Sequence, residues 1–115
     1  MIFMKQVILD TSFIITSIKQ KVDFFDDDIL KGVKIVIPEQ VIRELEGLGA
    51  KLALAILEKN EFTLIRIPGR DADTAIINFA KKNPEAIVAT LDRGLQRKVK
   101  NRKLIIRQKK KLEII

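Results

Sequence analysis

The chain of 115 residues contains no cysteine, histidine, tryptophan or tyrosine. Without cysteine it can form neither a disulfide framework nor a thiolate metal site. Without histidine it lacks the commonest metal ligand, the commonest general base and any Ser-His or Cys-His catalytic pair. Any hydrolytic chemistry must therefore rest on carboxylates, on lysine or on a metal-bound water.

Long apolar runs are also missing. No stretch approaches the roughly 18 uncharged apolar residues that a membrane span requires, and the opening MIFMKQVILD is too short and too soon charged for a signal peptide. The composition, 47% hydrophobic and 32% charged, is typical of a compact folded protein. We therefore expect one domain over residues 1–115, located in the cytoplasm and without membrane contact.

Positive charge is concentrated near the C-terminus. The segment 93–111 has no acidic residue and holds ten basic ones: Arg93, Arg97, Lys98, Lys100, Arg102, Lys103, Arg107, Lys109, Lys110 and Lys111. The net charge is +7, so the rest of the chain carries −3, the difference between +7 and +10. A basic segment beside an acidic body favours a nucleic-acid partner. The plainer alternative is a solvated basic helix and tail.

Short apolar runs alternate with amphipathic segments along the whole chain. The runs predict strands at 5–9, 33–37, 62–67, 86–90 and 103–107, with an edge strand at 111–115. The amphipathic segments predict helices at 13–20, 22–32, 39–48, 51–60, 71–83 and 91–101. This alternation predicts an α/β fold, a three-layer sandwich with a central, mainly parallel sheet of about five strands.

Four carboxylates follow predicted strands or begin predicted helices: Asp10, Glu44, Asp73 and Asp92. Asp10 ends the first strand, and Asp92 lies two residues after the strand at 86–90. If these strands are neighbours, both carboxylates face one crevice at the carboxyl edge of the sheet. Four converging carboxylates repel one another unless a divalent cation lies among them. The pattern therefore predicts a metal site.

Capping offers a plainer role for two of these acids. Asp10 could cap the helix that follows it, but Thr11 and Ser12 can cap equally well and would leave Asp10 free. Asp92 could cap the helix that starts near Arg93. Capping is compatible with a supporting role at a metal, so both interpretations of Asp92 remain open.

Helical phase bears on the other two acids. Asp73 falls on the apolar side of its helix with Ile76, where an ionised carboxylate is costly unless it is paired or bound to a metal. Asp71 falls on the polar side, so Asp73 is the candidate ligand. Phase does not choose between Glu44 and Glu46, and either could simply be solvated.

Four segments, in this order, resemble the PIN domain, a metal-dependent nuclease fold related to flap endonucleases. They are VILDTS, IPEQVIRELE, DADTAIINFA and VATLDRGL, and together they span nearly the whole chain. The resemblance places the four family acids on Asp10, Glu44, Asp73 and Asp92. It thereby selects Glu44 over Glu46.

Two further positions match the family's supporting residues. Ser12 matches the small polar residue that supports the first acid, and Thr90 matches the threonine that precedes the fourth. The resemblance implies an endoribonuclease in which the four acids hold Mg²⁺ or Mn²⁺ and cleavage leaves 5′-phosphate and 3′-hydroxyl ends. Hard oxygen ligands suit these ions better than Zn²⁺.

The basic segment supplies candidate contacts to the RNA backbone, which are salt-sensitive and independent of sequence. The candidates are Arg93, Arg97, Lys98 and Lys100. Because phenylalanine is the only aromatic residue type, we expect little stacking on RNA bases.

The subfamily bears on the partners. VapC-type toxins often carry another acid about three residues beyond the fourth, and here that residue is Leu95. The C-terminal pattern is closer to compact archaeal PIN proteins related to rRNA-processing nucleases. The resemblance thus implies an RNA substrate, an antitoxin or a ribosomal precursor particle as partner, and a homodimer.

Two other classes of function remain. The first is a non-catalytic RNA-binding or ribosome-assembly module that retains the PIN fold, against which the four intact acids argue. The second is an aspartate-based phosphatase or receiver domain. Ser12 stands where such phosphatases need a second aspartate, and the acidic pair of receivers is missing.

Overall fold

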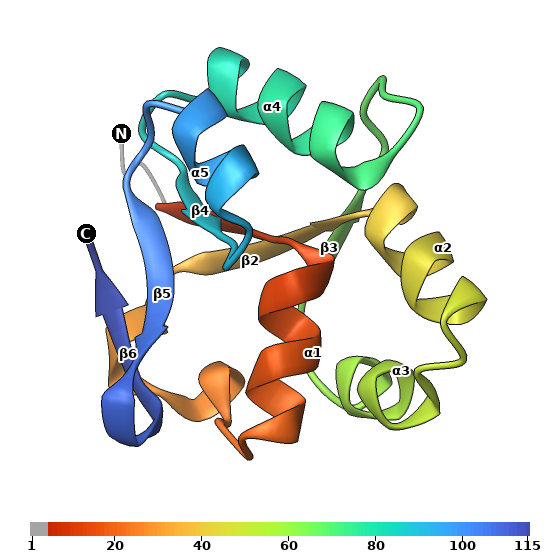
Figure 1. Ribbon diagram of the computed structural model, residues 1–115, viewed down its shortest axis with the longest axis vertical. Helices are drawn as coiled ribbons and strands as arrows, with labels where there is room; N and C mark the ends of the chain where they lie inside the picture. The colour runs from red at the N-terminus through yellow and green to blue at the C-terminus, as the bar shows by residue number, and fades with distance from the viewer. Residues whose placement is uncertain (1–4) are drawn as a thin grey trace.

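The computed structural model describes residues 5–115, with the side chain at position 109 left out (Figure 1). Residues 1–4, which belong to the expected domain and to the opening segment discussed above, lie outside the described residues. The strands are β1 (Gln6–Leu9), β2 (Lys34–Pro38), β3 (Thr63–Ile65), β4 (Ile87–Ala89), β5 (Lys103–Arg107) and β6 (Lys111–Ile114). The helices are α1 (Thr11–Lys19), α2 (Glu39–Gly47), α3 (Lys51–Glu58), α4 (Ala72–Lys82) and α5 (Arg93–Lys98). Short 3₁₀ turns are η1 (Phe24–Asp26), η2 (Asp28–Leu30) and η3 (Gln108–Lys110).

The six strands form one sheet in the order β3-β2-β1-β4-β5-β6. The first five are parallel, and β6 returns antiparallel to β5. Figure 1 shows α4 and α5 on one side of the sheet and α1 and α3 on the other. The predicted α/β sandwich is confirmed, with β6 as a sixth strand. Winding reverses between β1 and β4, the position where parallel sheets of this kind bind ligands.

The two central strands form the middle of the core. Val7, Ile8 and Leu9 of β1 are fully buried, as are Val88 and Ala89 of β4. Both faces of these strands are covered, which explains why their sequences are continuous apolar runs instead of alternating ones. None of the helices among the described residues is long and apolar enough to cross a membrane.

Two local predictions were wrong. The segment 22–32 forms the turns η1 and η2 instead of a helix. Its Asp27 carboxylate accepts a hydrogen bond from the Ile29 backbone N–H (2.9 Å), a local bond that competes with helix formation. The apolar pattern of the predicted helix 39–48 also places Leu48 in the core. The structure leaves Leu48 62% exposed, because α2 ends at Gly47 and Gly49, with φ +66°, turns the chain toward α3.

The connection from β3 to α4 packs tightly against the helix that it precedes. A Cβ added at Gly69 would lie 2.6 Å from the backbone nitrogen of Ala75 and 2.8 Å from its Cα. Real Cβ atoms do not approach backbone so closely, so any side chain at position 69 must displace the start of α4. The absence of a side chain at position 69 therefore lets the connection pack directly against the first turn of α4.

We predict that Gly69→Ala lowers the free energy of unfolding by about 1–3 kcal/mol, the typical cost of overpacking. Gly47→Ala is the matched control, because Gly47 is helical and a Cβ there would meet no atom within 4 Å. That change should leave stability unchanged or raise it by up to about 1 kcal/mol. Urea denaturation measures both, and equal effects of the two substitutions would contradict the packing argument.

Candidate active site

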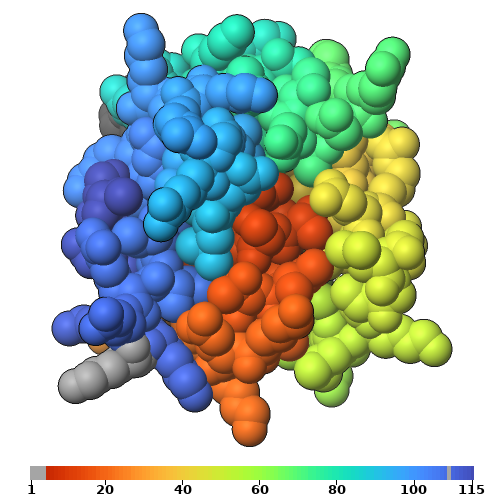
Figure 2. Space-filling model, in the orientation of Figure 1, coloured from red at the N-terminus to blue at the C-terminus, as the bar shows by residue number. Residues whose placement is uncertain are grey.

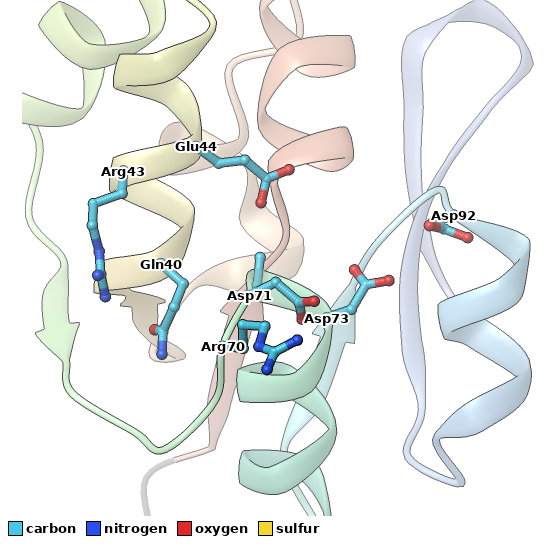
Figure 3. Close-up of a pocket in the computed structure, with 8 residues that line it drawn as sticks. Gln40, Arg43, Glu44, Arg70, Asp71, Asp73 and Asp92 are labelled. Carbon is cyan, nitrogen blue, oxygen red and sulfur yellow. The ribbon is translucent and has the colours of Figure 1, made fainter.

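An open cleft of about 580 Å³ lies beyond the carboxyl ends of the central strands. It is lined by Gln40, Arg43, Glu44, Arg70, Asp71, Ala72, Asp73 and Asp92 (Figure 3). In Figure 2 the start of α1 lies recessed between α5, α4 and α2. Four of the lining residues are acidic, and three of those are acids that the sequence predicted.

Asp10 is the buried member of the acidic group. It follows β1 directly, is 4% exposed, and its backbone N–H donates to the Ala89 carbonyl of β4 (2.9 Å). Although Asp10 occupies the N-cap position of α1, its side chain makes no capping bond. Instead its Oδ2 accepts hydrogen bonds from the hydroxyls of Thr90 (2.7 Å) and Ser12 (3.0 Å). No ion pair to Asp10 is found within residues 5–115.

The hydroxyls of Ser12 and Thr90 also accept hydrogen bonds from the backbone of the loop after β4. Ser12 Oγ accepts from the backbone N–H of Leu91 (3.1 Å), and Thr90 Oγ1 accepts from the backbone N–H of Asp92 (3.1 Å). The hydroxyls lie 3.3 Å apart. The network therefore joins the start of α1 to the loop after β4, and it fixes the orientation of the Asp10 carboxylate.

Glu44 projects from α2 into the cleft and is exposed. Partial burial, followed by the negative charge of Asp10, raises the pKa of Glu44. The charges of Asp73 and Asp71 add to this rise, while the hydroxyl of Thr11 lowers the pKa. These carboxylates therefore lie near enough to repel one another.

Asp73 stands in the first turn of α4. The prediction that it faces inward was wrong: it is exposed and lines the cleft. The first turn of α4 lies at the edge of the cleft, so a side chain on its apolar side meets the cleft instead of the core. Partial burial and the charges of Asp10 and Asp92 raise the pKa of Asp73, and Lys98 lowers it.

Asp92 caps α5 and lines the cleft at the same time. Its Oδ1 accepts from the backbone N–H groups of Gly94 (2.8 Å) and Leu95 (3.2 Å). Asp71, assigned from its helical phase to the polar side, also lines the cleft. It caps α4 by accepting from the Thr74 backbone N–H (2.8 Å), a bond that lowers the pKa of Asp71. The position of Asp71 directly before the first residue of α4 was the sequence signal for this capping role.

Sequence reasoning missed three further lining residues: Gln40, Arg43 and Arg70. Gln40 is 7% exposed, and its Nε2 donates to the carbonyls of Ile67 (2.8 Å) and Gly69 (2.9 Å). On α2, Gln40 and Arg43 lie within one turn of Glu44, and this helical spacing was the signal available for them. Arg70 had no such signal, because its connection meets Gln40 from a distant part of the sequence.

The acids have the right chemistry for a divalent cation, but their side chains are too far apart in this structure to enclose one. Within the described part of the chain, no three of them lie close enough together to enclose one ion. Their oxygens are hard ligands of the kind that Mg²⁺ and Mn²⁺ prefer. Partial burial, followed by the negative charge of Asp10, raises the pKa of both Glu44 and Asp73. Both side chains are exposed and can rotate toward a bound ion.

Comparisons with known proteins agree with this arrangement. A family described as "PIN like domain" matches residues 7–109. The chain is 34% identical to Ribonuclease VapC4 of Methanocaldococcus jannaschii, over 96% of this chain and 97% of that one. It is 32% identical to the rRNA-processing protein FCF1 of Saccharomyces cerevisiae over 83% of this chain, but spans 54% of that relative, about half of its length. The solved structure of the PIN domain endonuclease Utp24 superposes with a TM-score of 0.76 at 25% identity, covering 95% of this chain and 90% of that one.

We predict that Glu44→Gln and Asp73→Asn each raise the melting temperature at pH 7 in the absence of divalent ions. A carboxyl whose pKa is raised in the folded state disfavours folding once it is ionised. The gain should therefore be full above the raised pKa and vanish below about pH 4. Because both groups are exposed and screened, we expect less than about 1 kcal/mol, or up to about 5 °C.

The matched control is Glu46→Gln, which removes the same charge two residues away on α2 and outside the cleft lining. Calorimetry between pH 3 and pH 8 measures all three variants. A gain that is equal for Glu46→Gln, or that persists at pH 3, would contradict repulsion within the cleft.

Proposed function

This chain belongs to the PIN domain family, and from that membership and the acidic cleft we propose that it is a metal-dependent endoribonuclease. Its substrate is RNA, and the reaction is hydrolysis of a phosphodiester bond. The observation that carries the proposal is a cleft lined by acids of α2, α4 and the start of α5, with the buried Asp10 after β1 near enough to raise the pKa of Glu44 and Asp73. The VapC4 relative is named a ribonuclease, and the Utp24 structure is named an endonuclease.

The cation would be held by Asp10, Glu44 and Asp73, directly or through water, with Asp92 completing the site. When bound, Mg²⁺ or Mn²⁺ supplies a Lewis acid that lowers the pKa of water and neutralises charge in the transition state. Asp10 is suited to be the fixed ligand, because Thr90 and Ser12 hold its Oδ2 and leave Oδ1 for the ion. Glu44 and Asp73 are suited to close around it.

The basic face of α5 would hold the RNA backbone beside the acids. Arg93, Arg97 and Lys98 of this helix are exposed, and Lys100 follows it. Lys98 lies near enough to Asp73 to lower the pKa of that carboxyl. Such phosphate contacts give affinity without sequence specificity.

The relatives divide the physiological role between a VapC-type ribonuclease and an rRNA-processing protein. One position favours the second role. Leu95, which stands where VapC-type toxins often carry another acid, is 1% exposed and packs in the core. We accordingly favour a ribosomal precursor RNA over an antitoxin-regulated target.

We predict that the protein cleaves an end-labelled structured RNA in Mn²⁺ or Mg²⁺ and not in EDTA. Asp73→Asn and Glu44→Gln should each lower the cleavage rate by at least about 100-fold, the effect expected when a group that acts on the transition state is removed. Products should carry 5′-phosphate ends, which can be read by ligation. Both substituted residues are exposed, so the variants should remain folded.

Glu46→Gln serves again as the control and should cleave at the wild-type rate. Asp10→Asn tests the buried acid, with circular dichroism to show that it is folded. A folded wild type that binds RNA without divalent ions and never cleaves it would contradict the proposal. That result would favour the non-catalytic RNA-binding module.

A further inference from the structure

We propose that Arg43 and Arg70 form a second phosphate-binding wall, on the side of the cleft opposite α5. An RNA strand would then cross the acidic group with basic residues on both sides. The inference rests on the proposed function, because it concerns how RNA lies over the same acids. It adds a binding site outside the basic segment 93–111.

Both arginines border the cleft itself. Arg43 belongs to α2 and Arg70 to the connection before α4, and both are exposed. Figure 3 shows Arg43 across the cleft from Asp92, with Asp73 between them and Arg70 beside the chain that enters α4. Asp73 therefore lies between Arg43 and the start of α5, and Asp71 lies beside Arg70 (Figure 3).

Neighbouring acids compensate the charge of the two arginines only in part: Glu39 contacts Arg43, and Arg70 lies near enough to Asp71 to lower the pKa of that carboxyl. Glu39 pairs with Arg43 (2.9 Å) and also with Arg66 (3.2 Å), so two guanidinium groups share one carboxylate. Arg70 takes part in no ion pair within 4.0 Å among residues 5–115. Each exposed guanidinium retains N–H donors in the planar fork that matches a phosphate.

The connection that carries Arg70 is held in place on several sides. The Gln40 side chain binds the carbonyls of Ile67 and Gly69, and the Asn78 amide donates to the carbonyl of Pro68 (2.8 Å). Gly69 in turn packs against Ala75. A fixed backbone at positions 67–69 limits the conformational entropy that Arg70 would lose on binding.

Gln40 links the two arginines structurally. It lies one turn before Arg43 and Glu44 on α2, while its side chain fixes the connection to Arg70. Its Oε1 is buried without a hydrogen-bond partner in the described part of the chain, which is a cost to stability. Gln40 thus joins the helix that carries Arg43 to the connection that carries Arg70.

A polynucleotide is the ligand class that fits this arrangement. Arginines on one wall and α5 on the other attract phosphates, while the acids between them repel phosphate unless a cation intervenes. A single nucleotide could occupy one wall only. A strand can place phosphates on both walls and its scissile phosphate over the acids, which couples binding to the reaction site.

The binding of a fluorescent 20-nucleotide single-stranded RNA in EDTA, followed by anisotropy at KCl concentrations from 50 to 300 mM, tests this wall. Each basic residue that no longer neutralises a phosphate of single-stranded RNA should reduce the slope of log K against log salt concentration by about 0.7. Arg43→Gln/Arg70→Gln should therefore reduce the slope by about 1.4. Affinity at 100 mM KCl should fall roughly tenfold.

Lys34→Gln/Lys82→Gln is the matched control. It removes the same charge from exposed residues at the start of β2 and the end of α4, away from the cleft lining, and should leave the slope within error of the wild type. A second comparison, Arg97→Gln/Lys98→Gln, removes charge from α5. Combined with the arginine variant, its effect on affinity should be additive, as expected for separate binding groups.

An arginine variant that matches the control in slope and affinity would overturn the inference. Wild-type cleavage of the same RNA in Mn²⁺ is scored separately, so RNA binding and cleavage without any arginine effect would reject this wall and keep the proposed function. A wild type that neither binds this RNA in EDTA nor cleaves it in Mn²⁺ would reject both. Circular dichroism melting shows that each variant is folded.

Discussion

Burial of one negative charge among others constrains this structure. Asp10 is 4% exposed, and the described bonds to its carboxylate come from two neutral hydroxyls. An ionised carboxylate is costly in such surroundings unless a positive charge lies nearby. Acids from α2 and α4 add their own charge to the same region, and partial burial together with the charge of Asp10 raises the pKa of Glu44 and Asp73. A cation bound among these acids would reduce the free-energy cost of burying the Asp10 carboxylate.

The fold explains why the acids meet. Parallel pairing of β1 with β4 aligns Leu9 with Ala89, so the residues that follow each strand emerge at one edge. The hydrogen bonds from Ser12 and Thr90 to Asp10 then tie these two exits together. The helices α2 and α4 begin at the same edge. The meeting of the acids at one edge is thus a consequence of sheet topology.

Much of this could be predicted from the sequence, since β1 and β4 are continuous apolar runs and each is followed by an acid. The periodicity within one segment does not show which other segments it will contact in the folded chain. Asp73 faces the cleft instead of the core because α4 begins at its edge. Arg70 borders the cleft from a connection that the buried Gln40 holds in place. Gln40 does so through hydrogen bonds to Ile67 and Gly69, which lie 27 and 29 positions further along the chain. The segment 22–32 does not form a helix, and its Asp27 carboxylate instead bonds locally to the Ile29 backbone N–H.

The central claim is that this cleft binds a divalent cation through its acids. A crystal structure of the protein with Mn²⁺, using anomalous scattering to locate the ion, tests it most directly. We expect an anomalous peak in the cleft, bound directly or through water to Asp10, Glu44 and Asp73. A cleft without a peak at millimolar Mn²⁺, or an ion bound only at the acids of residues 26–28, would contradict it.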